Sequence, residues 1–375
     1  MSRMSMIVLA ASACLVWSGV ESAAQEPSAP AEPNPTAGTT SDGPSGYVLF
    51  VGLESEDAVA IVDPAAGEVV KKIPVGVSTE DIEGVHALTL APDGKHYYLS
   101  IAHGWPYGSI WKMTTANDSL VARTNVGLFP ATTAITPDGM WLFVANYNLH
   151  GDPQTDTVSV VHTPTMTEVK QIPVCTKPHG LVASNDGSTV YVSCTRDNVL
   201  KKISLSTLSV VDSTSTLTEQ DRAEDKVCYP AGLALSKDDS ELYVACHKHS
   251  EIRVMPTDRF GTFTNAIPVG DGPYLIKVDP SGERLYVPNR DSQSFSVVDL
   301  ASETVIDTRP SSATHPHTFT FGPDGMVFLS MESHAVVPGA IDVIDPETLA
   351  TIRSIPVGLQ ATGAGAVALP PSHFD

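Results

Sequence analysis

Apolar and polar residues alternate in short runs over most of the chain, and the runs come in pairs that flank a turn. The clearest pair is VHALTLAPDGKHYYLS at 85–100, where a Pro-Asp-Gly turn separates two alternating stretches. This pattern predicts a β-hairpin. Equivalent segments begin at residues 131, 179, 231, 274 and 317. From residue 46 onward, no stretch has the apolar spacing of an amphipathic helix.

A second alternating pair follows each hairpin, so the repeating unit consists of four short strands. Clear examples are VAIVDPAAGEVVKKIPVG at 59–76 and IDVIDPETLATIRSIPVG at 341–358. The turn residues Gly94, Gly139 and Gly187 are 45 and 48 residues apart. This spacing is typical of one four-stranded propeller blade.

The two ends of the repeat region complement each other. The repeats begin at Gly46 with what corresponds to the last three strands of a blade, and they end with TGAGAVALPP at 362–371, a lone first strand. Pairing of the ends removes exposed sheet edges. We therefore predict an all-β, seven-bladed propeller over 46–371, with four-stranded antiparallel blades and a first blade closed by the C-terminal strand.

Short phrases within the repeat carry a family resemblance. LFVAN at 142–146, LYVPN at 285–289, VVD at 297–299 and IPVG at 355–358 resemble the consensus of YVTN-type seven-bladed β-propeller repeats of exported bacterial and archaeal proteins. The resemblance covers about 46–371 and implies the fold rather than an activity. That family includes surface-layer and binding proteins, and its architecture is similar to those of lactonases, lyases and propeller subunits of dehydrogenases. This sequence departs from the consensus at Cys194 and Cys246, where Asn is expected.

The first 45 residues differ from the rest. Arg3, an apolar stretch over 4–20 and the small residues before Gln25 have the features of a signal peptide over 1–24, cleaved after Ala24. Lipidation of Cys14 is the weaker alternative. Residues 25–45 are rich in Pro, Ala, Ser and Thr, which predicts a disordered linker, and 372–375 form a short tail.

Charge and hydropathy limit the compartments and the classes of partner that we expect for this protein. The chain has 22 Lys and Arg residues against 43 Asp and Glu residues, a net charge of −21, which opposes binding to a phosphate backbone. No apolar run after the signal peptide reaches the ~20 residues that cross a bilayer. We expect a periplasmic or secreted monomer without a transmembrane segment or nucleic-acid partner. Its partner would be a small ligand, a carbohydrate or a periplasmic or cell-surface protein.

Four cysteines follow the signal peptide, in two parallel pairs. Cys175 and Cys228 each precede the first strand of a unit, and Cys194 and Cys246 each end the second strand. These positions lie opposite each other in an antiparallel hairpin, so we predict disulfides Cys175–Cys194 and Cys228–Cys246, which export permits. A thiolate metal site or a redox disulfide near His179 or His247 is the alternative.

Connections between successive strands alternate between the two faces of a propeller. Most of the histidines fall in connections on the same face. Counting eight residues back from each turn gives one equivalent position beside the central channel, occupied by His86, Ala131, His179, Ala231, Tyr274 and His317. His86, His179 and His317 are placed to hold a transition metal such as copper, zinc or iron. Hydrogen bonding to a neighbouring blade is the structural alternative.

Loop residues on the same face complete a candidate ligand-binding surface. Arg196 and Arg290 are suited either to binding an anionic ligand or to forming inter-blade salt bridges. Glu332 and His334 could act together as a general acid and base. The whole set adds aromatic and further histidine side chains: His103, Trp105, Tyr147, His150, Arg196, His247, His249, Tyr274, Arg290, Glu332 and His334.

Motifs of the common catalytic classes are missing from the sequence. We find no Gly-x-Ser-x-Gly elbow, phosphate-binding Gly loop, dinucleotide fingerprint or Cys-x-x-Cys-His heme attachment in the required context. We therefore expect a binding or scaffold protein that presents its His-rich face to a ligand or partner, with catalytic residues unknown. A metal-dependent lyase, hydrolase or oxidoreductase is the alternative, and an accessory subunit of a redox enzyme is a third reading.

Overall fold

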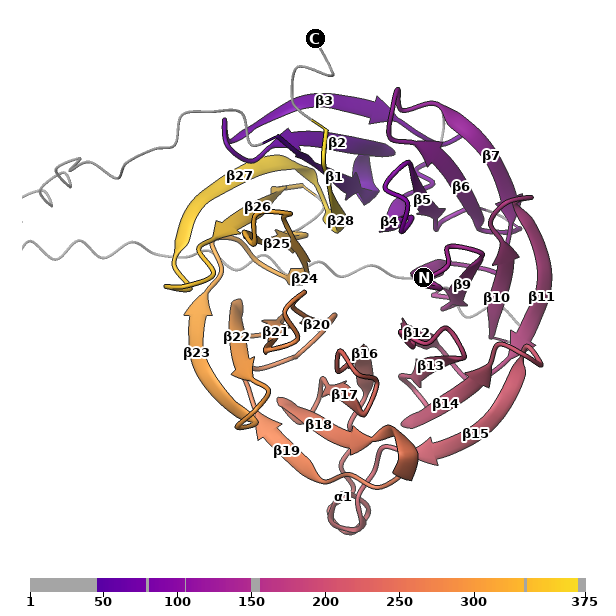
Figure 1. Cartoon of the computed structure of the whole chain (residues 1–375), viewed down its shortest axis with the longest axis vertical. Helices are drawn as coiled ribbons and strands as arrows, with labels where there is room; N and C mark the ends of the chain where they lie inside the picture. Colours follow the sequence, from indigo (N-terminus) through magenta and orange to yellow (C-terminus); the bar gives the residue numbers. More distant parts are fainter. Residues whose placement is uncertain (1–45, 79–80, 105, 150–155, 334–335, 370–375) are drawn as a thin grey trace, which may run out of the picture. The chain divides into compact units, whose positions relative to one another are not determined.

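Seven four-stranded antiparallel sheets stand radially around a central axis (Figure 1). The computed structural model describes residues 46–78, 81–104, 106–149, 156–333 and 336–369 of the 375-residue chain. The predicted seven-bladed all-β propeller is confirmed. The predicted signal peptide, linker and tail lie outside the described residues.

Each blade runs from an innermost strand at the axis to an outermost strand at the rim (Figure 1). Blade 1 comprises β28 (Ala361–Val367), β1 (Val48–Leu53), β2 (Ala58–Asp63) and β3 (Glu68–Pro74). Blade 2 comprises β4 (Val85–Leu90), β5 (His96–Ile101), β6 (Ser109–Thr114) and β7 (Leu120–Asn125). Blade 3 comprises β8 (Pro130–Ile135), β9 (Trp141–Asn146), β10 (Thr157–His162) and β11 (Thr167–Pro173).

The remaining blades follow the same plan. Blade 4 comprises β12 (Pro178–Ala183), β13 (Thr189–Cys194), β14 (Val199–Ser204) and β15 (Ser209–Ser215). Blade 5 comprises β16 (Pro230–Leu235), β17 (Glu241–Cys246), β18 (Glu251–Pro256) and β19 (Asn265–Pro268). Blade 6 comprises β20 (Lys277–Val278), β21 (Arg284–Asn289), β22 (Ser294–Asp299) and β23 (Thr304–Pro310). Blade 7 comprises β24 (Pro316–Phe321), β25 (Val327–Met331), β26 (Pro338–Ile344) and β27 (Thr351–Leu359).

The ring closes in blade 1, where the last strand of the chain pairs with the first. β28 and β1 are antiparallel, with Val367 opposite Val48. Strands from opposite ends of the sequence therefore share one sheet, as the two incomplete terminal repeats predict. Closure in this way pairs β1 on both sides, so the first strand of the chain is not an edge of its sheet.

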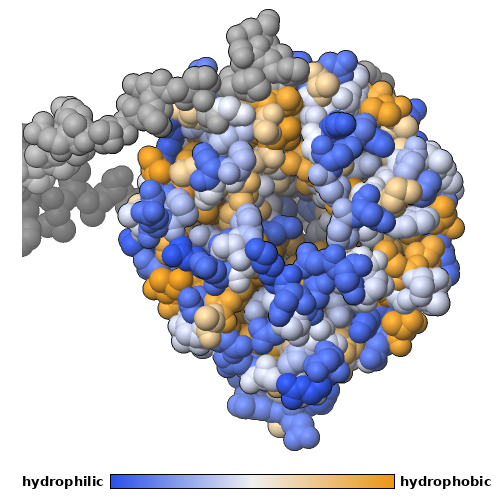
Figure 2. Space-filling model, in the orientation of Figure 1, coloured by the Kyte–Doolittle hydropathy of each residue, from blue (hydrophilic) through white to orange (hydrophobic). Residues whose placement is uncertain are grey.

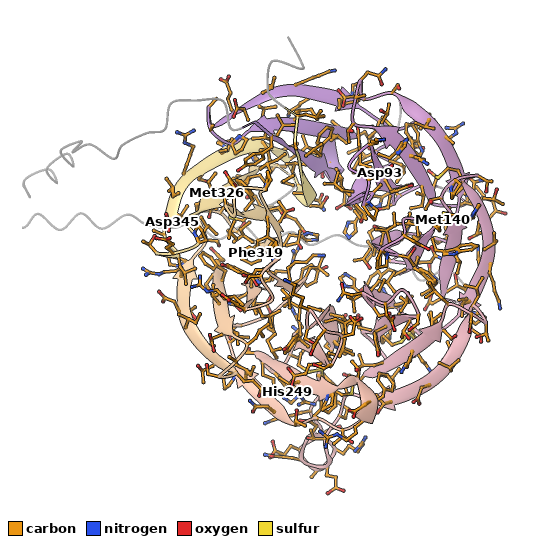
Figure 3. The ribbon with its side chains drawn as sticks, in the orientation of Figure 1. Asp93, Met140, His249, Phe319, Met326 and Asp345 are labelled. Carbon is orange, nitrogen blue, oxygen red and sulfur yellow. A yellow bond between two sulfur atoms is a disulfide. The ribbon has the colours of Figure 1, made fainter. Side chains whose placement is uncertain are left out.

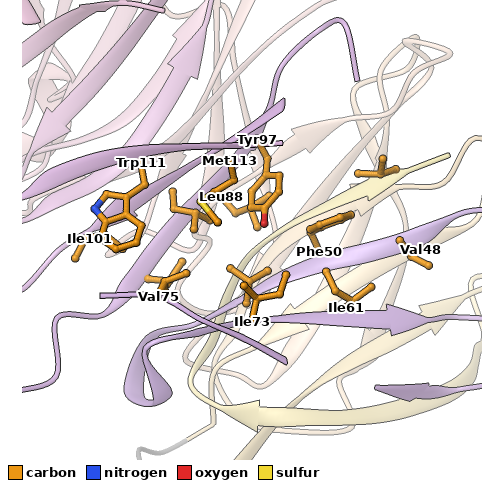
Figure 4. Packing of buried hydrophobic residues seen from close by; sticks show 14 residues of the cluster. Val48, Phe50, Ile61, Ile73, Val75, Leu88, Tyr97, Ile101, Trp111 and Met113 are labelled. Carbon is orange, nitrogen blue, oxygen red and sulfur yellow. The ribbon is translucent and has the colours of Figure 1, made fainter. Parts of the chain in front are cut away.

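The core lies between neighbouring sheets. Figure 4 shows the cluster between blades 1 and 2, where the rings of Phe50 and Tyr97 lie 4.8 Å apart and Trp111 packs nearby. β1 and β2 are buried along their whole length because a blade covers each face, whereas the rim strand β3 is largely exposed. This difference explains why middle strands are continuous apolar runs and rim strands alternate.

Glycine allows the innermost strands of blades 4 to 6 to approach closely. A Cβ on Gly180 would lie 2.3 Å from the carbonyl oxygen of Ala231, and one on Gly232 would lie 2.2 Å from that of Tyr274. No other residue fits at such distances. These contacts bring the side chains beside each glycine to the edge of a narrow channel.

Both predicted disulfides are present, Cys175–Cys194 in blade 4 and Cys228–Cys246 in blade 5. Each joins the segment before the innermost strand to the end of the second strand.

Short helices interrupt the β-structure at three places among the described residues: η1 (Glu54–Glu56), α1 (Glu219–Ala223) and η2 (Thr257–Arg259). α1 begins with a capping box, in which Thr218 and Asp221 each bond the other's backbone N–H. Five residues are too few for an apolar period, so the sequence did not reveal it. Among the helices of the described segments, none has the length and apolar character needed to cross a bilayer.

Candidate functional site

In most blades a β-bulge near the start of the innermost strand places one side chain outside the ladder, beside the channel. In blade 2 the ladder between β4 and β5 skips His86, which has no partner in the register. The ladder skips Ala131 in blade 3 and His317 in blade 7 in the same way, and it is interrupted at the equivalent place in blades 4 and 5. Bulges re-aim the extra side chain.

A left-handed backbone residue precedes each of these positions by two residues. These residues have φ between 49° and 71° and are Gly84, Phe129, Lys177, Tyr229, Gly272, His315 and Gln360. Five of the seven are not glycine, and each such residue costs on the order of 1 kcal/mol. We call the residues two positions later the first ring: His86, Ala131, His179, Ala231, Tyr274, His317 and Thr362.

A second ring lies directly after the second strand of each blade. Its seven backbone N–H groups donate to the carbonyl oxygens of the seven left-handed residues at 2.8–3.3 Å. The donors are Glu54, Ala102, Tyr147, Thr195, His247, Arg290 and Glu332. This repeated bond fixes the two rings next to each other, and their side chains form the channel mouth. Figure 2 shows one face hollowed at its centre, with hydrophilic residues around much of the opening.

Glu54 organises one side of the mouth. His86 Nδ1 donates to its Oε2 and His103 Nε2 to its Oε1, each at 2.8 Å. Gln360 Nε2 also donates to Oε2, at 2.9 Å. Since Glu54 is 3% exposed, these three donors replace the water that a carboxylate requires.

Glu332 organises the neighbouring side. Arg290 forms a bidentate pair with it, with Nη1–Oε1 at 2.8 Å and Nη2–Oε2 at 2.6 Å. This is the inter-blade pairing expected for Arg290. His317 Nε2 lies 3.2 Å from Glu332 Oε1, but without the geometry of a hydrogen bond. Its Nδ1 has no hydrogen-bond partner either, although His317 is only 2% exposed.

Aromatic contacts connect the two sides with the third histidine. Tyr274 Oη lies 2.9 Å from His179 Nε2, and the Tyr274 ring is 5.3 Å from that of His317. The rings of His86 and His317 are 5.9 Å apart. Tyr147 lies against His179 at 5.4 Å. Tyr274 therefore connects His179 to His317.

The buried pairs shift the pKa values at the mouth in opposite directions. Burial alone would raise the pKa of Glu54, but the charges and hydrogen bonds of His86 and His103 hold it well below its usual range. Burial alone would lower the pKa of His86, and the carboxylate of Glu54 outweighs this and raises it. Glu54 is therefore ionised at neutral pH and His86 favours its protonated form.

The other two histidines are held neutral. Burial, with the charges of His86 and His317, lowers the pKa of His179 to about 3. Burial also lowers the pKa of His317 to about 4, and the carboxylate of Glu332 only partly opposes this. At neutral pH both imidazoles can donate one hydrogen bond and accept another.

Two cavities open at the rings. One of about 90 Å³ lies on the axis, lined by residues of all seven blades including His86 and His317. The other, of about 140 Å³, is lined by second-ring and first-ring side chains and their neighbours, including Tyr147, His179 and Arg290. Together the cavities provide concave space beside convergent polar groups, the usual form of a small-molecule site.

The structure brings together most of the predicted surface residues. His86, His179, His317 and Tyr274 belong to the first ring, and Tyr147, His247, Arg290 and Glu332 to the second, with His103 bound to Glu54. Trp105, His150 and His334 lie outside the described residues.

Two predicted residues do not join the rings. His249 lies near α1, away from the centre (Figure 3), with Nε2 3.5 Å from Asp221. For comparison, Phe319, which lines the axial cavity, lies near the centre of the same view. Arg196 is exposed, and no salt bridge within the described segments involves it.

The predicted metal triad is not assembled as a metal centre. Among the described residues, no group of three or more His, Cys, Asp or Glu side chains is arranged to hold a metal ion. Tyr274 contacts both His179 and His317, whereas the ring contact among the three imidazoles is between His86 and His317. Metal binding by these histidines therefore stays a prediction without geometric support.

Sequence reasoning missed Glu54, the most connected carboxylate of the mouth. The repeat could have revealed it. The residue directly after the second strand of each blade belongs to the second ring, and Glu54 occupies that position in blade 1. Phe129 was also missed. It adopts the left-handed conformation before Ala131, and its ring lies 5.1 Å from that of His86.

Comparison with known proteins supports the fold. A family model described as "Lactonase, 7-bladed beta-propeller" matches residues 154–273. This segment contains His179 and both disulfides, but neither Glu54, His86, Arg290 nor Glu332. No curated protein matches the chain significantly.

Solved structures of low sequence identity share the architecture. The periplasmic gluconolactonase PpgL of Pseudomonas aeruginosa superposes with a TM-score of 0.66 at 19% identity, over 86% of this chain and 99% of that chain. A functionally unknown protein from Desulfotomaculum acetoxidans gives 0.70 at 12% identity, over 86% and 99%. Dihydro-heme d1 dehydrogenase NirN, in complex with DHE, gives 0.55 at 13% identity, over 91% and 79%. The chain is thus similar to seven-bladed propellers of the lactonase type, and the finer YVTN-type resemblance stays a prediction.

Proposed function

We propose that the protein is an exported ligand-binding propeller whose channel mouth, formed by the two rings, binds a small polar molecule. The two disulfides support an oxidising compartment. The likeness to a gluconolactonase described as periplasmic agrees with this location.

The state of His317 carries the proposal. Both of its ring nitrogens lack a hydrogen-bond partner although the residue is 2% exposed and lines the axial cavity. Leaving a buried polar group unsatisfied costs about 1–3 kcal/mol, which a ligand that bonds the imidazole would offset. The charged neighbours are already paired, Glu54 with His86 and Arg290 with Glu332. The mouth thus favours polar contacts over a large net charge.

A binding survey tests the proposal. Sugars, sugar acids and amino acids would be titrated calorimetrically, and melting temperatures measured in parallel. A ligand at 100 times its Kd stabilises a protein by about 2.7 kcal/mol, which raises Tm by about 5 °C at this size. We expect His317→Phe to weaken binding at least tenfold and His162→Phe, on the opposite face, to leave it unchanged. Equal affinity in wild type and His317→Phe would refute a site at the mouth.

Hydrolysis is a second candidate, favoured by the Glu54–His86 pair. A carboxylate that raises the pKa of a cavity-lining imidazole favours its protonated, proton-donating form, which suits protonation of a leaving oxygen. The lactonase-type match over 154–273 suggests lactones as first substrates to test. Nuclear magnetic resonance would follow their opening. We expect His86→Gln to slow the reaction 10²–10⁴-fold, whereas wild type no faster than buffer would exclude this activity for those lactones.

The metal-dependent form of this alternative has its own measurement. Elemental analysis of protein purified without a His tag would detect stoichiometric copper, zinc or iron if His86, His179 and His317 hold it. Replacement of all three by alanine should then remove the metal. Metal that remains in the triple variant would lie elsewhere.

A further inference from the structure

The axial cavity continues from the rings into the channel, where a lysine side chain lines it. Its lining includes Lys277 of β20 together with His86 and His317. Among the described residues that line it, none has a carboxylate. The side chain of Lys277 is exposed, although protein surrounds the channel on all sides.

Lys277 has no counter-charge. No carboxylate of the described residues lies within salt-bridge distance of it, whereas other channel-mouth charges are paired. Desolvation by the protein atoms that surround the channel is the sole cause that lowers the pKa of Lys277, with no acidic neighbour to raise it. The chain has a net charge of −21. An unpaired lysine that faces the channel can nevertheless attract and bind an anion.

The distance between Lys277 and the first ring sets the length of the ligand. Lys277 follows the first-ring residue Tyr274 by three positions on the innermost strand, which places it ~10 Å deeper at 3.3 Å per residue. The half-buried side chains of Leu181 and Leu275 line the cavity between these levels. At the ring end, His317 offers an unbonded neutral imidazole. The channel thus has a positive charge at depth, leucine side chains among threonines in the middle, and polar groups at the mouth.

We propose that the axial cavity binds a short-chain monocarboxylate end-on, with its carboxylate at Lys277, its carbon chain along the leucine side chains and its far end toward His317. This inference rests on the proposed function and names the ligand class of that site. A cavity of about 90 Å³ has room for on the order of six to eight water-sized atoms, as many as butyrate to hexanoate contain. A phosphate ion would leave the leucine side chains uncovered and would find one unpaired cation for its two charges.

Calorimetric titration with acetate, propionate, butyrate and hexanoate tests the inference. Affinity should rise about three- to fourfold for each methylene added, because each covers more of the leucine side chains. Lys277→Met and Lys277→Gln should both weaken butyrate binding at least tenfold, provided that their melting temperatures show a folded protein. Lys170→Met removes the same charge from the exposed rim strand β11 and should bind butyrate as wild type does.

Three results would overturn the carboxylate assignment. These are butyrate affinity unchanged in both Lys277 variants, phosphate or chloride binding as tight as butyrate, and an affinity that does not depend on chain length. The proposed function fails separately. A neutral polar ligand whose affinity falls in His317→Phe but not in Lys277→Met would keep the site at the mouth while excluding the carboxylate.

Discussion

Blades 4 and 5 hold the channel mouth together by other means than blades 6, 7, 1 and 2 do. In blades 4 and 5 a disulfide ties the end of the second strand to the chain before the first. On the other side, buried ion pairs centred on Glu54 and Glu332 connect one blade to the next. The covalent side presents His179, Ala231, Thr195 and His247 to the rings, and the charged side presents the buried pairs of Glu54 and Glu332. Disulfides and buried ion pairs thus stabilise opposite parts of one ring.

The last residue of the second strand makes this division clear. Asn146 and Asn289 occupy this position in blades 3 and 6, and each uses Nδ2 to bind two hydroxyl groups of the adjacent strand. Cys194 and Cys246 replace them in blades 4 and 5. Blades 1, 2 and 7 have an apolar residue there, and in blades 1 and 7 a carboxylate follows. In every blade the last residue of the second strand has a structural role. The residue after it belongs to the second ring, whose side chains form the channel mouth.

Removal of both disulfides should produce the largest effect on stability. Each closes a loop of about 20 residues and contributes roughly 3 kcal/mol in the chain-entropy model, so the quadruple Cys→Ser variant should lose about 6 kcal/mol if the two are independent. Urea unfolding would measure the loss. Addition of dithiothreitol should destabilise wild type alone. Ligand affinity at the mouth should persist in the folded variant, and its loss would show that the disulfides do more than stabilise the ring.

Neutralisation of Glu54 should have the next largest effect and should act on both stability and chemistry. Glu54→Gln leaves the buried imidazole of His86 without its charge partner, which costs about 3–5 kcal/mol. The pKa of His86 should then fall below its ordinary value, because burial is no longer opposed. Urea unfolding and a titration of the imidazole by nuclear magnetic resonance would measure the two effects.

The matched control for this variant is Glu68→Gln on the exposed end of β3. It removes the same charge and should change stability by less than about 0.5 kcal/mol. An unchanged pKa of His86 in Glu54→Gln would show that the pair does not control the protonation of the mouth.

The repeat made much of this molecule predictable from sequence. Strand count, ring closure, both disulfides and the first-ring positions follow from a local pattern of turns and alternating residues. Ring closure follows from the two incomplete repeats at the ends of the chain. The disulfides and the first-ring positions depend on hairpin register, which the chain specifies within about 20 residues of itself. The histidines at 86, 179 and 317 could be assigned to one ring for this reason.

Distances across the ring could not be predicted in the same way. Whether His179 meets His317 depends on how closely neighbouring blades pack, which is set by contacts such as the one at Gly232. His249 was assigned to the correct face, but the hairpin pattern does not encode how far a loop residue lies from the axis. The contact between Glu54 and His86 joins two blades, so neither repeat alone contains it.

Acid should weaken the charged side of the mouth through the neutral histidines. An unfolded histidine titrates near pH 6.5, whereas the pKa of His317 is lowered to about 4. Between these values the unfolded chain takes up a proton that the native protein excludes, so stability falls as pH drops from 6.5 to 4 and this contribution levels off below. His317 accounts for on the order of 3 kcal/mol of that loss. In urea unfolding at each pH, His317→Gln should show a shallower decline, and His96→Gln on the opposite face should follow wild type. An equally steep decline in His317→Gln would mean that other groups, such as the buried carboxylates, govern the acid response.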